Sequence, residues 1–463
     1  MTDAALDSPF AGRYGSPEMR AIWSDAHKRA LWRQAWVALA EAEAQAGVVS
    51  QAQLEDVRAH AAEPNTARAL ALEREIGHDV MAELRAFAEQ CPVGGGILHF
   101  GATSADITDN ADVLRQRDAL RLLRSRLAEL LSAFAAQIDA YQDVVSMAYT
   151  HLQPAEPTTI GYRLAVYAQD ALEALGSIDR LIAGLRGKGL KGAVGTAASY
   201  QELLAGTSME PAALEAEFLT QLALPAFPIA TQTYPRGQDY TVLTTLSGLA
   251  GGLHKFAFDL RLLQAQGFGE WSEPFGENQV GSSAMPFKRN PVNAEKVCSL
   301  ARFVAAMPAV AWENAAESLL ERTLDDSANR RATLPEAFLA CEECVLTCIR
   351  LVRGLVVDTT ASAANLEKFG PFAATERVLM ALVRAGADRQ HMHERLRQQS
   401  LKAWEAVKAG RPNPLGASLA ADPELLVYLQ PARLRELMDA RAYVGTAPKR
   451  AAALAAEIRR VLG

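Results

Sequence analysis

One short segment, Gly-Ser-Ser-Ala-Met-Pro-Phe-Lys-Arg-Asn-Pro at residues 281–291, combines a flexible start with three kinds of polar side chain. The Gly-Ser-Ser start is too small and flexible to form part of a core. Lys288 and Asn290 follow closely and lie between Pro286 and Pro291. This combination is typical of a mobile loop that carries a hydroxyl, a cation and an amide to a ligand. Taken alone, it is also typical of a solvated surface loop.

Three further segments place polar side chains between long apolar stretches of the chain. In the first, at residues 99–106, Thr103 and Ser104 stand where a helix would begin. Their hydroxyls and the free backbone N–H groups could hold a carboxylate or a phosphate, although plain helix capping is the common role of such residues. In the second, at residues 150–157, His151 is followed by two prolines that fix the path of the chain. A histidine there could donate a proton or serve as a surface cap.

The third segment, residues 321–331, is rich in charge. Asp326 or Ser327 can cap the helix that follows, and Arg322 and Arg331 flank the positive end of that helix. A phosphate site is the specific interpretation, and a solvated charged turn is the general one. Together with the loop described first, these segments supply a base, a histidine acid, a cation and an anion site. Those are the groups needed to eliminate a substituent β to a carboxylate.

Long stretches with helical periodicity separate these segments. Between Thr108 and Thr150 there is no Gly or Pro, and apolar residues recur every three or four positions. That pattern predicts one helix of about forty residues. Comparable patterns predict four more long helices, at residues 158–185, 239–263, 293–316 and 328–355. No segment shows the sustained alternation of a half-buried strand, so an all-α fold is expected.

Long helices cannot bury their apolar stripes as single rods, so they are expected to form a bundle and to bury more surface in a homo-oligomer. An earlier amphipathic helix is expected to begin with Ser16 as its N-cap and Pro17 at its first position, and to stop near Gly47. Polar and glycine-rich segments then divide the chain into three expected helical domains, at residues 1–103, 104–357 and 358–463.

The composition is that of a soluble globular protein, with 463 residues, 49% hydrophobic, 22% charged and a net charge of −7. The negative charge argues against a nucleic-acid-binding surface, and no apolar run approaches the ~18 residues of a membrane span. No signal peptide is recognised and cysteines are few, so a reducing cytoplasm is expected. Cys341, Cys344 and Cys348 could begin a metal site on one helix face, but buried packing is favoured because no fourth ligand is near.

Several of these segments resemble one known family. GSSAMPFKRNP is similar to the specific loop motif of the fumarase, aspartase and argininosuccinate lyase superfamily, and HFGATSADITDN, THLQPAEPTT and residues 321–331 resemble its adenylosuccinate lyase family. The resemblance implies an all-α homotetramer of three-domain subunits, with each active site shared between three subunits. It also implies release of fumarate from two succinyl substrates of purine synthesis, adenylosuccinate and succinylaminoimidazole-carboxamide ribotide. No metal or organic cofactor is expected.

The resemblance further implies a role for each polar residue. Ser282 is the expected base, with an alkoxide stabilised by Lys288 and by loop amides. His151 is the expected acid, oriented by Glu295. His78 is expected to support the phosphate or His151. The other substrate contacts are expected from Arg13, Tyr14, Asp79, Thr103, Ser104, Thr150, Gln232, Asn290, Lys296, Arg322, Ser327 and Arg331.

Two positions depart from the family pattern. Gly77 stands where a basic residue is common in the family, so one anion contact is expected either to be missing or to come from another residue. Lys296 stands where some relatives have arginine, and lysine keeps the charge but loses the bidentate fork. Two other interpretations stay open. Another fumarate-releasing lyase, such as argininosuccinate lyase, would share the bundle but would not need the phosphate site of Arg322, Ser327 and Arg331. A non-catalytic structural member of the same fold would not need intact catalytic residues.

Overall fold

The computed structural model describes residues 8–276 and 278–463. The chain divides into two compact units, each built from three separate stretches of sequence. The first unit comprises Met1–Leu127, Ala174–Gly251 and Ser299–Leu346, and the second comprises Ala128–Glu173, Gly252–Cys298 and Thr347–Gly463. The three-domain division expected from the sequence stays a prediction.

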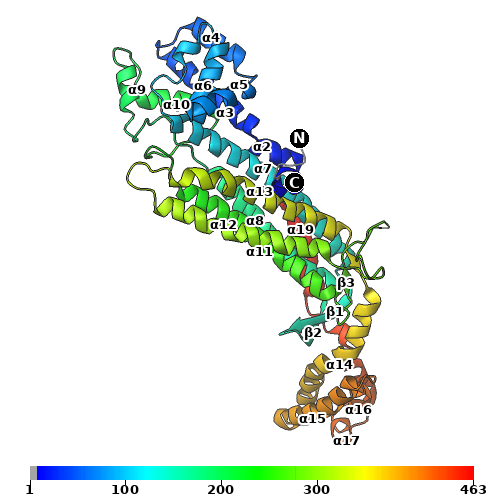
Figure 1. Cartoon of the computed structure of the whole chain (residues 1–463). Coiled ribbons are helices and arrows are strands. Elements are labelled where there is room, and N and C mark those ends of the chain that lie inside the picture. Colours follow the sequence, from blue (N-terminus) through cyan, green and yellow to red (C-terminus); the bar gives the residue numbers. More distant parts are fainter. Residues whose placement is uncertain (1–7, 277) are drawn as a thin grey trace. The chain divides into compact units, whose positions relative to one another are not determined.

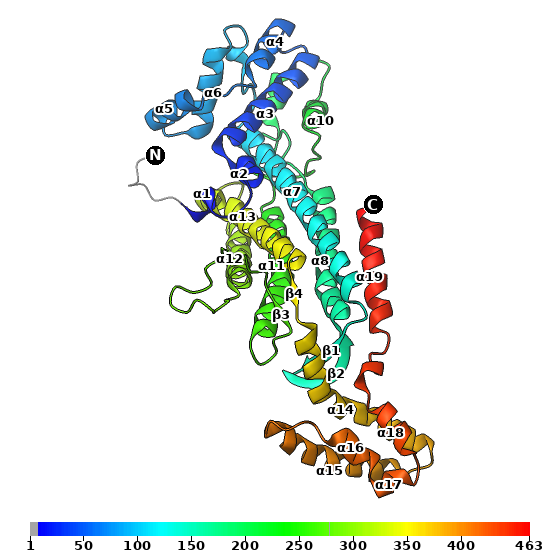
Figure 2. The same cartoon turned by 90° about the vertical axis from the view of Figure 1, so that its right-hand side faces the viewer.

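The five long helices predicted from the sequence are present, and with the other helices they confirm the expected all-α class (Figures 1 and 2). Each one arises where an uninterrupted 3.6-residue periodicity provides a continuous apolar stripe. Four of them begin and end within three residues of the predicted positions. The five helices are α7 Ser104–Tyr141, α8 Ile160–Gly184, α11 Gly237–Gln264, α12 Val292–Ala316 and α13 Asp325–Arg353.

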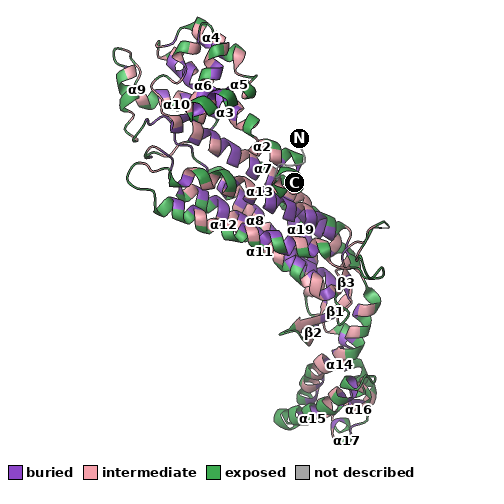
Figure 3. Cartoon of the chain, viewed as in Figure 1, coloured by how far each residue is buried: buried purple, intermediate pink, exposed green. Residues whose placement is uncertain are grey.

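Within each unit the segments of these helices pack against one another. In the first unit, Cys341 of α13 donates its thiol proton to the backbone oxygen of Leu246 on α11 at 3.8 Å. In the second, Phe256 of α11 makes edge contacts with Phe134 of α7 and with Tyr167 of α8, with ring centroids 5.4 Å apart in both pairs. Buried residues run along the long helices (Figure 3), so the predicted helical bundle is present.

The three cysteines of α13 are part of this packing. Cys341, Cys344 and Cys348 are all fully buried, and none of the three forms a disulfide. The one group of His, Cys, Asp and Glu side chains close enough to hold a metal, among the residues described, does not include them. The interpretation of these cysteines as buried hydrophobes therefore holds.

The first unit also contains shorter helices before and between its long segments. One sequence prediction fails here, because the helix expected from Ser16 to Gly47 is two helices. Ser24 adopts an extended conformation (φ −66°, ψ 154°), and its hydroxyl accepts a hydrogen bond from the N–H of His27, so it caps a new helix. The shorter elements are α1 Pro9–Gly12, α2 Pro17–Trp23, α3 Asp25–Gln45, α4 Gln51–His60, α5 Thr66–Ile76, α6 Asp79–Gln90, η1 Gly95–Ile97, α9 Ala198–Leu203 and α10 Pro211–Leu222.

The second unit contains strands that the sequence reading missed. The helix predicted to reach Thr150 ends at Tyr141, and residues 145–150 form a strand that pairs antiparallel with residues 153–159. Met147 of this hairpin packs on Leu366 and Ala440, far away in the sequence. This long-range packing prevails over the local helical pattern, since strand preference depends on context more than helix preference does.

The remaining elements of the second unit are short strands and the C-terminal helices. Trp271–Ser272 pairs antiparallel with Val356–Val357. No helix among the described residues is long and apolar enough to cross a membrane. The elements are β1 Val145–Thr150, β2 Gln153–Thr159, β3 Trp271–Ser272, β4 Val356–Val357, α14 Thr359–Arg384, α15 Arg389–Lys408, α16 Leu415–Ala420, α17 Pro423–Leu426, α18 Pro431–Leu437, η2 Ala440–Ala442 and α19 Ala447–Leu462.

Candidate active site

A cavity of about 600 Å³ opens in the first unit. Three helices present their N-terminal ends to it: α6 through Asp79 and Val80, α7 through Ser104 and Ala105, and α13 through Ser327. The free N–H groups and the positive dipole end of a helix attract anions. Three such ends around one cavity therefore favour a ligand with several negative charges.

The cavity brings together many of the residues predicted to bind substrate. They come from segments that are more than 200 positions apart in the chain, so only the fold makes them neighbours. The predicted residues that line the cavity are His78, Asp79, Ser104, Gln232, Arg322, Ser327 and Arg331.

His78 and Asp79 form the edge of the cavity at the start of α6. The ring Nδ1 of His78 accepts a hydrogen bond from the N–H of Met81 at 3.3 Å, so His78 caps the helix. A neutral ring that accepts at Nδ1 carries its proton at Nε2, and that nitrogen can donate to a ligand. Asp79 receives the guanidinium of Arg331 at 3.0 Å, which holds this arginine beside the helix end.

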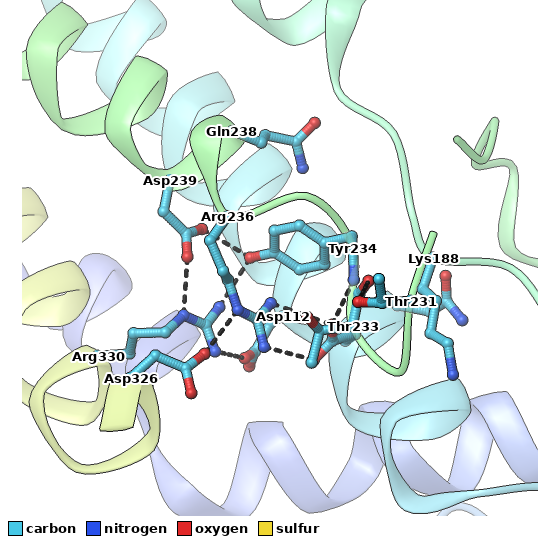
Figure 4. A network of polar contacts seen from close by, with 12 residues as sticks. Asp112, Lys188, Thr231, Thr233, Tyr234, Arg236, Gln238, Asp239, Asp326 and Arg330 are labelled. Atoms are coloured by element: carbon cyan, nitrogen blue, oxygen red, sulfur yellow. Dashed lines mark hydrogen bonds and ion pairs between the residues drawn. The ribbon is translucent and has the colours of Figure 1, made fainter. Parts of the chain in front are cut away.

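A buried ion network supports another part of the cavity wall, and Figure 4 shows most of its residues. Arg236 donates two hydrogen bonds to Asp109, at 3.0 and 3.2 Å, and a third to Asp326 at 2.6 Å. Arg322 donates to the other oxygen of Asp326 at 2.7 Å. Because Asp326 lies in the first turn of α13, these bonds fix the position of that helix end. Asp326 thus accepts hydrogen bonds from two arginines. The sequence predicted that Asp326 or Ser327 would cap this helix, but α13 already begins at Asp325, so neither residue precedes it.

Arg330 anchors a second part of the same network (Figure 4). It donates to Asp239 at 2.7 Å and to the hydroxyl of Tyr234 at 2.7 Å. The Tyr234 hydroxyl in turn donates to Asp239 at 2.6 Å, and Gln116 donates to both. The sequence reading missed Arg236 and Arg330, because their partners lie 90 or more positions away.

The network is strongly charged yet almost fully paired. Burial alone would raise the pKa of Asp326, but Arg236 and Arg322 outweigh burial and hold this pKa below its usual value. The pKa of Asp239 is lowered for the same reason, chiefly by Arg330. Both carboxylates are therefore ionised at neutral pH. Arg236 and Arg330 are committed to these carboxylates, so contact with an anionic ligand falls to the other cations of the cavity wall, to the serine hydroxyls and to the helix ends.

Two tryptophans of the cavity were also missed. Trp23 and Trp32 line it, and the indole Nε1 of each is buried with no hydrogen-bond partner in the part of the chain that the structure describes. Trp32 is only 3% exposed. A buried donor without a partner is costly, and a ligand acceptor in the cavity would satisfy it. Lys28, paired with Asp25 at 2.6 Å, adds a cation to this wall.

Three predicted residues of the first unit do not line the cavity. Thr103 precedes the cavity residue Ser104, and its N–H donates to Asp106 at 3.0 Å. Arg13 is exposed just after α1. Tyr14 is half-buried, and its ring packs against Phe10 with centroids 5.7 Å apart. Their contacts with substrate stay predictions.

The predicted acid belongs to the second unit. His151 and Leu152 form the turn between β1 and β2, and both have left-handed backbone angles, with φ of 54° and 59°. Such angles are costly for residues other than glycine, and they gather at functional sites. Thr150 pairs with Gln153 at the end of the hairpin. Thr150 and His151 are exposed, so a ligand can reach the imidazole.

The 281–291 loop also belongs to the second unit. The hydroxyl oxygen of Ser282 accepts hydrogen bonds from the N–H groups of Ala284 at 3.4 Å and Met285 at 3.1 Å. Donors of this kind stabilise an alkoxide. Asn290 donates its side-chain amide to the backbone oxygen of Gly281 at 2.9 Å and so fastens the two ends of the loop. Lys288 is exposed.

Two further predicted residues lie on α12, just after this loop. Glu295 is exposed, and its carboxylate is 3.9 Å from the guanidinium of Arg261. The expected pairing of Glu295 with His151 stays a prediction. Lys296 is half-buried on the same helix.

The departure at Gly77 has a structural reason. Gly77 ends α5 in a left-handed conformation, with φ of 67°, and its N–H donates to the backbone oxygen of Glu73 at 2.8 Å. Glycine is the residue that adopts this cap at little cost. Lys28 is a cation of the same cavity wall.

The protein is a lyase, since residues 12–305, more than half of the chain, match the family model described as lyase. Two solved structures share the fold. A fumarate lyase from Mesorhizobium sp. BNC1 superposes with a TM-score of 0.84 and 25% identity, covering 96% of this chain and 99% of the other. A 3-carboxy-cis,cis-muconate lactonizing enzyme from Pseudomonas putida gives a TM-score of 0.86 and 26% identity, covering 99% and 100%.

Residues 371–454 match a second model, described as the adenylosuccinate lyase C-terminus. The adenylosuccinate lyase of Saccharomyces cerevisiae is 38% identical over 450 residues, which cover 96% of this chain and 92% of the yeast protein. That of Archaeoglobus fulgidus is 34% identical over 452 residues, 96% of each chain. The chain belongs to the adenylosuccinate lyase family, as its polar segments predicted.

Proposed function

We propose that this enzyme eliminates fumarate from adenylosuccinate to give AMP, and from succinylaminoimidazole-carboxamide ribotide to give the carboxamide ribotide, in purine biosynthesis in the cytoplasm. The observation that carries the proposal is the cavity of the first unit, where three helix N-termini meet Arg322 and Arg331. Both substrates carry a phosphate and two succinyl carboxylates, so they match a site built for several negative charges.

The phosphate distinguishes this proposal from a related one. Argininosuccinate lyase chemistry would use the same bundle and loop, but its substrate has no phosphate. Arg331 and Ser327, beside the N-terminus of α13, form the phosphate-binding part of the proposed site, with His78 in support and Arg13 and Tyr14 as further nucleotide contacts. A substrate without a phosphate would leave these groups unused.

The succinyl group would be held by hydroxyl and amide groups. Ser104 lies at the N-terminus of α7, and Thr103 precedes it. Gln232 lines the cavity and is held by the hydrogen bond from its side-chain amide to the backbone oxygen of Ala193 at 3.1 Å. We assign these three residues to the succinyl carboxylates.

The chemical step needs a base for a very weakly acidic proton. The proton leaves a carbon next to a carboxylate, so negative charge spreads into that carboxylate and must be held by preorganised positive groups. We assign the base to Ser282, whose oxygen already receives two backbone N–H groups. Lys288 and Asn290 would hold the growing charge once the loop encloses the substrate.

The leaving nitrogen needs a proton. We assign this proton to His151, on the exposed turn of the β1–β2 hairpin, with Glu295 as its orienting carboxylate. The cavity lining includes neither the proposed acid nor the proposed base. A homotetramer with active sites shared between three subunits would bring these groups to each cavity, and that is the assembly we propose.

The experiment measures fumarate release by the purified protein from adenylosuccinate and, separately, from argininosuccinate. Release from adenylosuccinate alone is expected. Release only from argininosuccinate would overturn the substrate assignment, and release from neither would favour a non-catalytic role. Ser282→Ala and His151→Ala should each lower turnover by about two orders of magnitude or more. Ser283→Ala, at the exposed neighbouring serine, is the matched control and should keep turnover within a few-fold.

A further inference from the structure

A second constellation of polar side chains lies among the N-terminal helices. Asp56 and His60 stand one turn apart on α4, and Cys91 is the residue that ends α6. One ligand atom from each side chain, a carboxylate oxygen, a ring nitrogen and the sulfur, lies within 4.8 Å of the other two. We propose that these three residues bind a single divalent transition-metal ion of the zinc class, at a structural site apart from the active site.

The helix geometry places two of the ligands together. Residues four apart lie on the same face of a helix, and Nδ1 of His60 is 3.3 Å from Oδ1 of Asp56. The third ligand comes from a different helix, and its sulfur is 4.0 Å from the backbone oxygen of Asp56. One ion could therefore join the end of α4 to the end of α6.

The surroundings hold the ligands in place. The other carboxylate oxygen of Asp56, Oδ2, accepts hydrogen bonds from the N–H groups of Val93 at 2.8 Å and Gly94 at 2.7 Å. These two bonds leave Oδ1 on the side of His60, where it lies 3.3 Å from the ring Nδ1. A side chain at Gly94 would meet the backbone oxygen of Gln53 at 2.4 Å, so the turn after Cys91 is pressed against α4. Such supporting bonds orient metal ligands before the metal binds.

The three ligand types also match a divalent ion in charge. Cys91 is 2% exposed, so its sulfur is shielded from water. A divalent ion that displaces the thiol proton would be bound by one thiolate and one carboxylate, whose two negative charges equal the charge of the ion.

The ligand types select the metal. Thiolate, imidazole and carboxylate suit zinc and its neighbours in the transition series, whereas calcium and magnesium require oxygen ligands. Nδ1 of His60 also lies 2.9 Å from the backbone oxygen of Asp56. If Nδ1 carries the proton and donates it to that oxygen, the ring must give up this hydrogen bond to bind the metal through Nδ1. The proton of the ring then lies at Nε2. The ring is 41% exposed, so water can receive that N–H. Water can also complete the coordination.

The proposed ion would stabilise the helix that carries part of the active-site cavity. α6 begins beside His78, at the cavity, and ends at Cys91. Buried ion pairs of Glu83 with Arg29 and Arg33 already hold the middle of α6 against α3. The metal would fix the far end of α6, and it takes no part in the elimination reaction.

The test is a titration of the full-length, metal-free protein with Co²⁺, which gives a thiolate-to-metal charge-transfer absorption only when a cysteine binds the ion. One equivalent of Co²⁺ should produce the absorption, and Zn²⁺ should abolish it by displacement. Cys91→Ser should remove the absorption. Cys298→Ser, at a buried cysteine in the second unit, should retain it.

A second variant guards against loss of folding in Cys91→Ser. The His60 ring is partly exposed, so His60→Gln should fold, and it should weaken Co²⁺ binding about ten- to a hundredfold. Zn²⁺ should also raise the thermal unfolding midpoint of the wild type but not of His60→Gln. Absence of a thiolate absorption in the wild type, or its persistence in Cys91→Ser, would refute the site. Equal Co²⁺ affinity of the wild type and His60→Gln would exclude the histidine ligand and refute it as well.

Discussion

The most informative single substitution for the stability of the first unit is Glu43→Gln. Glu43 lies on α3 and is 1% exposed. Neither of its carboxylate oxygens has a hydrogen-bond partner among residues 8–276 and 278–463. Burial raises the pKa of this carboxyl from 4.5 to about 9. The folded protein therefore holds Glu43 protonated at neutral pH, whereas the unfolded chain ionises it.

The size and the sign of the effect follow from these two pKa values. Because the pKa of Glu43 is higher in the folded state, the folded protein binds this proton more tightly than the unfolded chain does. The resulting contribution to stability is present in full below pH 4.5 and is lost as the pH rises towards about 9. Each pH unit in this window changes the free energy of unfolding by about 1.4 kcal/mol. Between pH 4.5 and 7.5, three such steps amount to a loss of about 4 kcal/mol.

Glutamine has nearly the shape of the protonated acid but does not titrate. Glu43→Gln and the wild type should thus have similar stability near pH 4.5, and the variant should be more stable by about 4 kcal/mol at pH 7.5. Urea unfolding at a series of pH values measures this difference. Glu55→Gln, at an exposed position of α4, is the matched control and should show no comparable trend with pH.

A stability difference between Glu43→Gln and the wild type that does not change with pH would refute the reasoning. It would show that Glu43 has the same protonation state in the folded and unfolded protein. A variant that loses stability relative to the wild type as the pH rises would also refute it. That result would require Glu43 to be ionised and stabilised at a site where it has no partners.

Three further predictions follow from the site. Arg236→Met leaves Asp109 and Asp326 as buried charges without this partner, so it should lower the free energy of unfolding by about 3–5 kcal/mol; a thermal unfolding midpoint equal to that of the wild type would contradict this. Arg331→Ala should raise KM for adenylosuccinate about ten- to a hundredfold, and an unchanged KM would remove this residue from the phosphate site. Backbone N–H groups of the 281–291 loop should exchange with solvent much faster than those in the middle of α7 when no ligand is bound, and equal protection would rule out a mobile catalytic loop.

Local patterns were sufficient for the long helices. A periodicity that continues for 25 or more residues leaves few alternatives, so α7 was predicted apart from its end, and the bounds of α12 were predicted closely although Pro308 lies inside that helix. The helix break at Ser24 is also local, but a serine within an amphipathic pattern looks the same whether it caps a new helix or faces solvent. Its extended backbone became visible only in the structure.

The hairpin at residues 145–159 could not be read from local patterns. Its residues are held by each other and by Leu366 and Ala440, which are more than 200 positions away. The same limit applies to Arg236 and Arg330, which resemble ordinary charged surface residues in the sequence. Their carboxylate partners are distant in the chain, and their burial depends on helices that pack only in the folded state.

By itself, the sequence determined the helical class, the family and the residue types that the chemistry requires, because these depend on local periodicity and on short motifs such as residues 281–291. Tertiary structure alone decided which polar groups meet. It joined three helix N-termini around one cavity, buried Glu43 without a partner, and brought Cys91 beside Asp56 and His60. The physical reason is that electrostatic and ligand contacts act across a few ångströms of space, and sequence separation does not record that distance.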